Sequence, residues 1–425
     1  MTSTVDIGLD YAKARDDADE LARFRHEFDL PRHTGREAGH YLCGHSLGLM
    51  PRQARTLVAR ELDRWATLGV EGHFDTGDGW FAFHERFAAP LARILGADSR
   101  EVVAMNSLTV NLHLMLASFY APAGDRRRIL IEQEAFPSDR YAVQSQLAFH
   151  GFDPHEDLIQ LQARSGRLSA DALDAALATQ PGRVALVLLP GVQYLTGEAV
   201  DMQACASVAR RHGCRVGFDL AHAIGNLELD LRASDPDFAV WCSYKYLNGG
   251  PGAIGGCFVN QRCLGDTKLP RLEGWWGHDK QGRFEPKTDF IPIDSAEAWQ
   301  LSNPPILAMA PLEAALGLFG AAGLKPLRNK SIALTAYLES LLTALCGDQI
   351  ELLTPPDPSA RGAQLSVKLR RGAERTAAVV NRLRAAGVVV DWRSPDILRL
   401  APVPLYNNFV DVHAAATALA AALRA

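Results

Sequence analysis

The sequence lacks the cysteine spacing of a metal-binding or disulfide-linked protein. Its seven cysteines are odd in number, scattered along 425 residues, and form no C-x-x-C pair. This distribution argues against a structural zinc site and a disulfide framework, and it is typical of core cysteines in a reducing compartment. The glycine fingerprint of dinucleotide-binding folds and the P-loop are also missing. We therefore expect no metal centre and neither of these nucleotide sites.

Blocks of one charge and long apolar runs are missing as well. The formal net charge is −5, and the two signs are mixed along the chain, so no basic block indicates a nucleic-acid or anionic membrane partner. The N-terminus has no apolar segment typical of a secretory signal. The most apolar long stretch, 306–324, contains Pro311 and Glu313 and predicts a buried helix. We expect a cytoplasmic protein with no nucleic-acid or membrane partner.

Short apolar, β-rich segments alternate with helical patterns from about residue 101 onward. The predicted strands are EVVAM, RRILIE, VALVLLP, CRVGFD, DFAVWC and AIGGCFV. Apolar strands separated by helices predict a mostly parallel sheet, and such sheets bind ligands at the carboxyl ends of their strands. The pattern restarts near residue 324. We expect a large α/β domain over 71–324, a small α+β domain over 325–425, and an N-terminal segment, 1–70, that packs with the small domain.

Two charged residues lie at predicted strand ends. Asp219 ends CRVGFD, three residues before His222, and Lys245 follows DFAVWC ahead of a Gly-rich segment. Desolvation favours the neutral amine that Schiff-base chemistry requires. Enzymes that use pyridoxal phosphate (PLP) pair such a lysine with an acidic group at the pyridine nitrogen. The alternative is a turn-forming aspartate and a solvated lysine.

Other segments offer cofactor or substrate contacts, and each also has a purely structural interpretation. Thr109, in SLTVNLH, could cap a helix whose free N–H groups face an anion. Phe136, in AFPSDRY, could stack on a flat ring or belong to the core. Trp275 and Asn303 lie in the loops LEGWWGHD and LSNPPI. Arg399, in the strand of LRLAPVPLYN, must be paired if it faces inward and could then bind a carboxylate; facing outward, it would contact solvent.

Together these segments resemble the kynureninases, PLP enzymes of the aspartate-aminotransferase fold, from YLCGHSLGL at 41–49 to LRLAPVPLYN at 398–407. The resemblance implies fold type I, with PLP as the cofactor and a small-molecule amino acid as the substrate. It also implies a homodimer in which the partner subunit completes the pocket. The implied reaction is hydrolysis of the Cβ–Cγ bond of L-kynurenine, or of its 3-hydroxy form. The products would be L-alanine and anthranilate or 3-hydroxyanthranilate, in tryptophan catabolism.

The resemblance also assigns roles to single residues. Lys245 would bind the cofactor covalently, and Tyr244 would donate a proton during catalysis. His73 and Asn303 would face the aryl group of the substrate, and Arg399 its α-carboxylate. The cofactor contacts would come from Leu108, Thr109, Phe136, Pro137, Ser138, Asp139, Asp219, His222, Tyr244, Lys245, Trp275 and Asn303.

One position departs from the family. Pro190 stands where some members have a hydroxyl that contacts the cofactor, so this contact is missing here or supplied by Thr196.

Two other functions remain open at this point. A cysteine desulfurase or class V aminotransferase would share the fold. A desulfurase, however, would be expected to have a cysteine on a mobile loop and D-x-A-Q where this chain has DLAH. A PLP-fold protein that has lost catalysis and serves as a regulator or scaffold is the other alternative. The pair of Asp219 and Lys245 argues against it.

Overall fold

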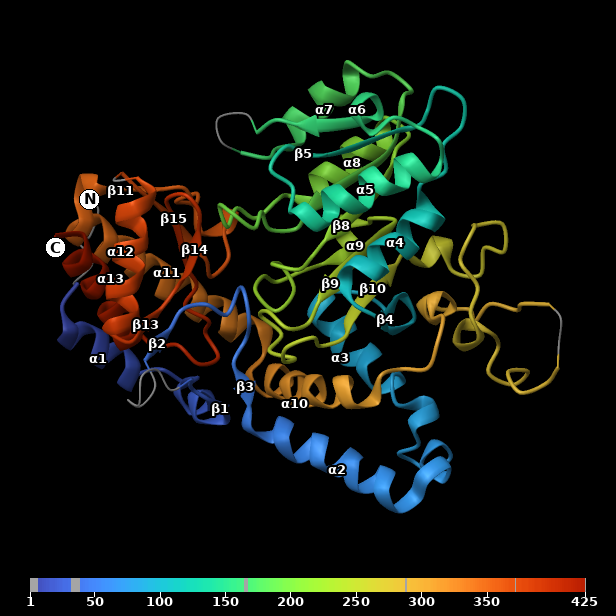
Figure 1. Ribbon diagram of the computed structural model, residues 1–425, viewed down its shortest axis with the longest axis horizontal. Helices are drawn as coiled ribbons and strands as arrows, with labels where there is room; N and C mark the ends of the chain where they lie inside the picture. Colours follow the sequence, from blue (N-terminus) through green and yellow to red (C-terminus); the bar gives the residue numbers. More distant parts are fainter. Residues whose placement is uncertain (1–6, 32–38, 164–166, 287–288, 371, 425) are drawn as a thin grey trace.

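A seven-stranded sheet forms the centre of the larger part of the molecule (Figure 1). The computed structural model describes residues 7–31, 39–163, 167–286, 289–370 and 372–424. The strands lie in the order β4 (Val102–Ala104), β10 (Gly255–Val259), β9 (Phe238–Cys242), β8 (Arg215–Asp219), β7 (Val184–Pro190), β5 (Arg128–Glu132) and β6 (Leu158–Leu161). β10 runs antiparallel to β4 and β9, and the other neighbouring pairs are parallel. The six predicted strands are confirmed, and β6 is an addition at the edge.

Helices cover both faces of this sheet, which explains why its central strands are apolar on both sides. Successive side chains of a strand point to opposite faces. Ile129 and Ile131 of β5 belong to one core cluster, and Leu130 belongs to the other. The first cluster includes α4 (Leu108–Phe119) and α5 (Pro137–Phe149). The second includes α3 (Glu85–Leu95), α7 (Ala170–Ala178), α8 (Met202–Arg211) and α10 (Ile306–Ala322). Two short helices are α6 (Pro154–Asp157) and α9 (Leu231–Ser234).

The C-terminal part has its own four-stranded antiparallel sheet and its own core cluster. The strand order is β11 (Ile350–Leu352), β12 (Leu365–Leu369), β15 (Ile397–Leu400) and β14 (Asp391–Arg393). The helices of this part are α11 (Leu324–Cys346), α12 (Ala373–Ala385) and α13 (Phe409–Arg424). Residues 388–393 form two short strands, β13 (Val388–Val389) and β14, which pair with different partners.

The N-terminal residues contact both parts of the molecule. α1 (Leu9–Asp17) packs against α13, and β2 (His40–Tyr41) pairs with β13. The short strands β1 (Phe28–Asp29) and β3 (Met50–Pro51) pair with each other. α2 (Arg52–Leu68) instead runs along α10 (Figure 1). Residues 43–48 therefore pass between the two parts, and Gly48 N donates a hydrogen bond to Tyr244 O over 2.8 Å.

No single helix in the described ranges is both long and apolar enough to cross a membrane; α10 and α11 meet that test only as a pair bent by 85°.

Candidate active site

The carboxyl ends of β5, β7 and β8 open into one cavity, together with the segment after β9. Most of the predicted cofactor contacts line it, and Pro137, Trp275 and Asn303 do not. The lining residues are Leu108, Thr109, Glu132, Phe136, Ser138, Asp139, Pro190, Val192, Tyr194, Asp219, Ala221, His222, Tyr244 and Lys245. The structure thus brings together residues more than 130 positions apart in the sequence, from Leu108 to Lys245.

Two buried carboxyl groups face Lys245 in this cavity. Asp219 ends β8, and its Oδ1 accepts a hydrogen bond from Ala221 N over 2.7 Å. Asp139, in the first turn of α5, lies beside it, and Asp139 Oδ1 has no other partner. Burial, and then the neighbouring Asp219, raises the pKa of Asp139. Burial also raises the pKa of Asp219, although the positive charge of Lys245 acts to lower it. Two buried carboxyl groups this close together are stabilised by a nearby positive charge. A cationic ring nitrogen bound between them would supply that charge.

Lys245 is buried, with a relative exposure of 8 %. Its Nζ lies 5.7 Å from the centroid of the Phe136 ring and 5.9 Å from that of Tyr244. Burial, and then the neighbouring Cys242 thiol, raises the pKa of Tyr244. The site therefore combines a primary amine that reaches the cavity with a phenol that stays protonated near neutral pH.

The N-terminus of α4 also faces the cavity. The helix begins at Leu108, and its N-cap residue Ser107 makes no side-chain cap hydrogen bond. Thr109 lies in the first turn rather than at the cap position. The free N–H groups of such a turn bind anions. His222 is buried, and its Nδ1 has no partner. An anionic end, a flat ring beside Phe136 and a cationic nitrogen at Asp219 are the features of PLP, so the residues present fit this cofactor.

Four lining residues were missed by sequence reasoning, of which Glu132 and Tyr194 have polar side chains. Glu132 ends β5 and is buried, and its Oε2 has no partner. Burial, followed by the charge of Asp219, raises the pKa of Glu132. Its position at the carboxyl end of a predicted parallel strand was the signal that could have identified it. Tyr194, whose ring centroid lies 5.3 Å from that of Phe136, follows β7 and carried no comparable signal.

Arg399 faces inward from β15, with a relative exposure of 1 %. Its Nε donates to Asp391 Oδ2 over 2.7 Å, its Nη1 to Tyr194 O over 2.7 Å, and its Nη2 to Ser46 Oγ over 3.2 Å. Arg399 is thus adjacent to a lining residue without lining the cavity itself.

Three predicted site residues lie away from this cavity. His73 packs against Trp80 and Phe81, with ring centroids 5.4 and 5.5 Å away. Trp275 is 45 % exposed, and its Nε1 donates to Arg283 O over 2.7 Å. Asn303 is exposed. The cavity of one chain therefore contains none of the predicted contacts to the substrate's aryl group.

Pro190 and Thr196 are the two residues at issue where the chain departs from the family. Pro190 lines the cavity. Thr196 does not, and its hydroxyl donates to Gln193 Oε1 over 3.3 Å. The structure therefore places no hydroxyl of Thr196 at the position opened by Pro190.

Comparisons with known proteins match both parts of the chain. A model of the kynureninase C-terminal domain matches residues 327–419. A model of the DegT/DnrJ/EryC1/StrS aminotransferase family matches residues 71–233. The chain is 51 % identical over 409 residues to a kynureninase of Xanthomonas campestris pv. campestris (strain B100), covering 96 % of each protein. It is 51 % identical over 405 residues to a kynureninase of Stenotrophomonas maltophilia (strain K279a), covering 95 % of each.

Solved structures of PLP enzymes share the fold at low sequence identity. One is a C-DES mutant with glycine covalently linked to the PLP cofactor; its TM-score is 0.76 at 20 % identity, covering 93 % of this chain and 98 % of that one. Another is the cysteine desulfurase CsdA of Escherichia coli, with a TM-score of 0.77 at 19 % identity, covering 95 % and 98 %. The predicted fold, PLP-dependent fold type I, is confirmed.

Proposed function

The chain belongs to the kynureninase family, and we propose that it hydrolyses the Cβ–Cγ bond of L-kynurenine or 3-hydroxy-L-kynurenine. The products would be L-alanine and anthranilate or 3-hydroxyanthranilate. The observation that carries the proposal is the cavity in which Lys245 faces Asp219 and Asp139, in a chain that aligns with kynureninases over nearly its full length.

The cofactor of this enzyme is PLP, which when bound withdraws electrons from the α-carbon of an amino acid. Lys245 would hold the cofactor covalently, and its amine would move the proton of the substrate's Cα. Asp219 would pair with the ring nitrogen, and the free N–H groups of α4 would bind the phosphate. Phe136 would lie over the ring, and His222 would contact the cofactor.

Substrate orientation and proton donation come from other residues of the site. Arg399 holds the α-carboxylate, which fixes one end of the substrate relative to Lys245. Water adds to the ketone carbon Cγ, and Tyr244 donates a proton to Cβ as the Cβ–Cγ bond breaks, so that the aryl part leaves as a carboxylic acid. Its pKa is raised by burial, so the phenol carries a proton to donate at neutral pH. Positioning of the reacting bond between these groups is a large part of the catalysis.

The direct test is product analysis. In separate reactions, purified protein should convert L-kynurenine or 3-hydroxy-L-kynurenine to equal amounts of L-alanine and anthranilate or 3-hydroxyanthranilate, without an added keto acid, and should release no sulfide from L-cysteine. Chromatography of the products measures this. Release of sulfide from cysteine, with neither kynurenine cleaved, would reject the proposal in favour of a desulfurase.

The fold alone would also suit a desulfurase, and the cysteines argue against that reading. A desulfurase needs a reactive thiolate on a loop near the substrate. Burial raises the pKa of Cys43 to about 11 and that of Cys242 to about 11. Both groups are thiols at neutral pH and react slowly as nucleophiles.

A homodimer is the second part of the proposal. Phe74, Phe81, Trp275 and Phe284 form an exposed aromatic patch. Phe284 lies 6.5, 5.1 and 5.4 Å from Phe74, Phe81 and Trp275, measured between ring centroids. Phe74 is 59 % exposed and Phe284 62 %. Contiguous exposed apolar surface marks interaction sites.

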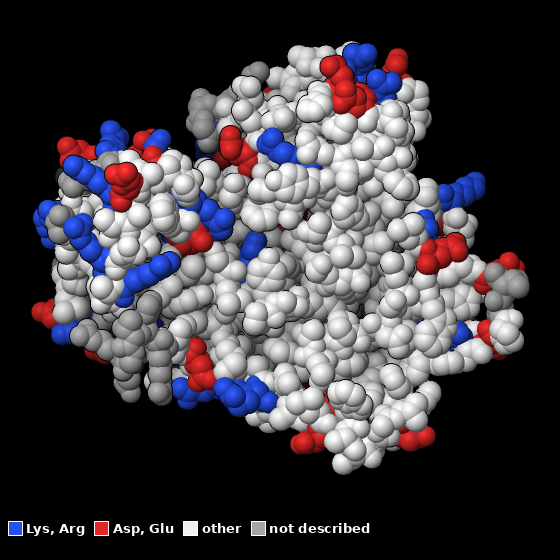
Figure 2. Space-filling model, in the orientation of Figure 1, with Lys and Arg blue, Asp and Glu red and all other residues white. Residues whose placement is uncertain are grey.

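A second copy of the chain is the occupant that fits this patch. His73 packs on Phe81 of the patch, and Trp275 belongs to it. His73 is expected to contact the substrate and Trp275 the cofactor, yet neither lies at the cavity of its own chain. Two-fold pairing would carry these residues to the cavity of the partner subunit. Figure 2 shows that charged side chains gather over the small part and at the rim of the face in view, and that few lie at its centre.

The compartment follows from the cysteines. All seven are free, and only Cys43 is more than marginally exposed. Proteins of oxidising compartments typically pair such thiols. We therefore place the enzyme in the cytoplasm.

A further inference from the structure

His45 is fully buried, with a relative exposure of 0 %, and neither of its ring nitrogens has a hydrogen-bond partner. Buried polar groups are almost always paired, so an imidazole with both nitrogens unpaired requires a partner supplied on binding or an ordered water molecule. None of the roles assigned above uses this residue.

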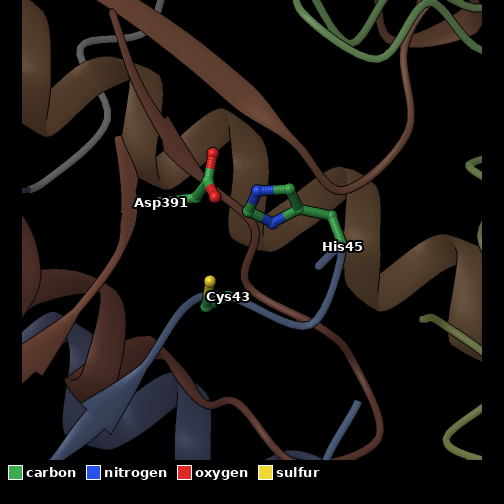
Figure 3. A group of neighbouring side chains, drawn as sticks. All are labelled: Cys43, His45 and Asp391. Atoms are coloured by element: carbon green, nitrogen blue, oxygen red, sulfur yellow. The ribbon is translucent and has the colours of Figure 1, made fainter. Parts of the chain in front are cut away.

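The imidazole lies between the cofactor cavity and Arg399. It is carried by the segment 43–48 that passes between the two parts of the molecule. Figure 3 shows its ring directed toward the Asp391 carboxylate, with the Cys43 sulfur below them. Ligand atoms of these three residues lie within 4.8 Å of one another. On its other side, the ring centroid of His222, which lines the cavity, is 6.4 Å away.

A metal ion is a poor occupant of this cluster. Asp391 Oδ2 already accepts hydrogen bonds from Arg399 Nε over 2.7 Å and from Arg393 Nε over 2.9 Å. Burial, and then the charge of Asp391, raises the pKa of the Cys43 thiol to about 11, so that a metal would have to displace a firmly held proton. Three cations, those of Arg399, Arg393 and Lys245, act on His45. This surplus of positive charge favours an anion.

Arg399 has hydrogen-bonding capacity left for such an anion. A guanidinium has five N–H groups. Three of them donate to Asp391, Tyr194 and Ser46. One N–H on Nη1 and one on Nη2 remain, which is the arrangement that binds a carboxylate through both oxygens.

We propose that His45 is a substrate-binding residue, which donates a hydrogen bond to the α-carboxylate that Arg399 holds. Burial, and then the charges of Arg399 and Lys245, lowers the pKa of His45 well below its ordinary value. The ring is therefore neutral and has one N–H to donate at neutral pH. A neutral donor adds specificity for the carboxylate without a further buried charge. The inference rests on the proposed function only in requiring an α-amino acid as the substrate.

The test compares two ligands that differ only at this group, L-alanine and L-alaninamide. Their binding to the cofactor-loaded enzyme is followed through the visible absorbance of the cofactor. We expect His45→Ala to weaken L-alanine binding by about tenfold or more, with L-alaninamide binding unchanged. His45→Asn, which keeps an N–H donor, should recover most of the L-alanine affinity.

His45→Ala also leaves a cavity at position 45, which could weaken binding by itself. His45→Leu keeps much of the side-chain volume but has no N–H donor, so it removes this ambiguity. We expect His45→Leu, like His45→Ala, to weaken the binding of L-alanine and to leave the binding of L-alaninamide unchanged. Equal weakening of both ligands in His45→Leu and His45→Ala would assign His45 a purely structural role and overturn the inference. Equilibrium dialysis that finds one tightly bound Zn²⁺, lost in Cys43→Ser and His45→Asn, would overturn it in favour of a metal site.

These outcomes separate the inference from the proposed function. Wild-type protein that cleaves neither kynurenine would reject the proposed reaction. Selective loss of L-alanine binding in His45→Ala would then still support His45 as a carboxylate ligand.

Discussion

At the scale of single residues, Tyr244 offers the sharpest test of the chemistry. The side chain lines the cavity next to Lys245, and its raised pKa keeps the phenol protonated. We expect Tyr244→Phe to lower kcat by about 100-fold or more, because general acid catalysis typically contributes that much. The visible absorbance of the bound cofactor should remain, since Lys245 is intact.

The matched control for this substitution is Lys245→Ala, which should lose both the covalently bound cofactor and nearly all turnover. A Tyr244→Phe enzyme with normal kcat would show that another group supplies the proton to Cβ.

Glu297 makes a pH-dependent contribution to stability. His84 Nε2 lies 2.8 Å and Lys280 Nζ 2.9 Å from its Oε2. Burial acts to raise the pKa of Glu297, but the hydrogen bonds from His84 and Lys280 prevail and hold it at about 2, below the ordinary value of 4.5. A lowered carboxyl pKa stabilises the fold above pH 4.5, and this stabilisation is lost as the pH falls toward 2.

The expected effect of Glu297→Gln is therefore a loss of about 2 kcal/mol in unfolding free energy at pH 7. The difference from the wild type should shrink steadily below pH 4.5. Denaturant unfolding at a series of pH values measures it. A difference that stays constant down to pH 3 would contradict the assigned cause.

At the scale of elements, the approach of β10 to the N-terminus of α4 sets the anion site. A Cβ at Gly255 would lie 2.5 Å from Trp241 O and 3.2 Å from Leu108 N. Gly255→Ala must therefore push apart β9, β10 and the first turn of α4. We expect weaker cofactor binding and a loss of about 1–3 kcal/mol in stability.

Gly317 on α10 provides the control, because a Cβ there meets no atom within 4 Å. Titration of cofactor-free protein with PLP, followed by its visible absorbance, should separate the two variants. Equal PLP affinities in Gly255→Ala and Gly317→Ala would mean that the first turn of α4 does not bind the phosphate.

The break between α10 and α11 divides the elements into two groups. The helices meet at an angle of 85°, and Gly323 between them has a φ of +77°, which favours glycine. The core clusters divide within the first turns of α11, with Leu327 in the cluster of the large part and Leu334 in that of the C-terminal part. We propose a domain boundary at this point, near residue 324. α1 and β2 then belong with the C-terminal domain, and α2 lies on the large one.

The sequence predicted the strands of the large sheet because their apolar runs are buried on both faces and end in chemically distinctive residues. Asp219 and Lys245 could be located at the same edge by that rule alone. β6 was missed because its Leu–Ile–Gln–Leu run is short, lies at the edge and begins directly after the short charged helix α6. His45 was missed because its unpaired nitrogens and its position beside Arg399 depend on contacts between residues more than 340 positions apart. Local sequence patterns carry no such information.

At the scale of the whole molecule, the chain separates residues that we propose act together in one site. Lys245 and Asp219 line the cavity, whereas His73 and Trp275 lie at the aromatic patch with Phe74, Phe81 and Phe284. A two-fold dimer through this patch would unite them, with each site taking its lysine from one subunit and its aryl-binding residues from the other. The aromatic patch would then form part of each active site, so that disrupting the dimer must also remove activity.

Mixed dimers test this arrangement directly. Lys245→Ala and Trp275→Ala chains should each be nearly inactive alone. When the two are expressed together, half of the dimers are mixed, and each mixed dimer has one site with both residues intact. We therefore expect recovery of about a quarter of the wild-type kcat, measured on purified mixtures with L-kynurenine. In a matched pair, Lys245→Ala with Asp219→Ala, both changed residues line the cavity of their own chain, so each of the two cavities of a mixed dimer lacks one of them. That pair should accordingly stay inactive, and recovery of activity by it, or none by the first pair, would show that the two residues do not meet across a subunit interface.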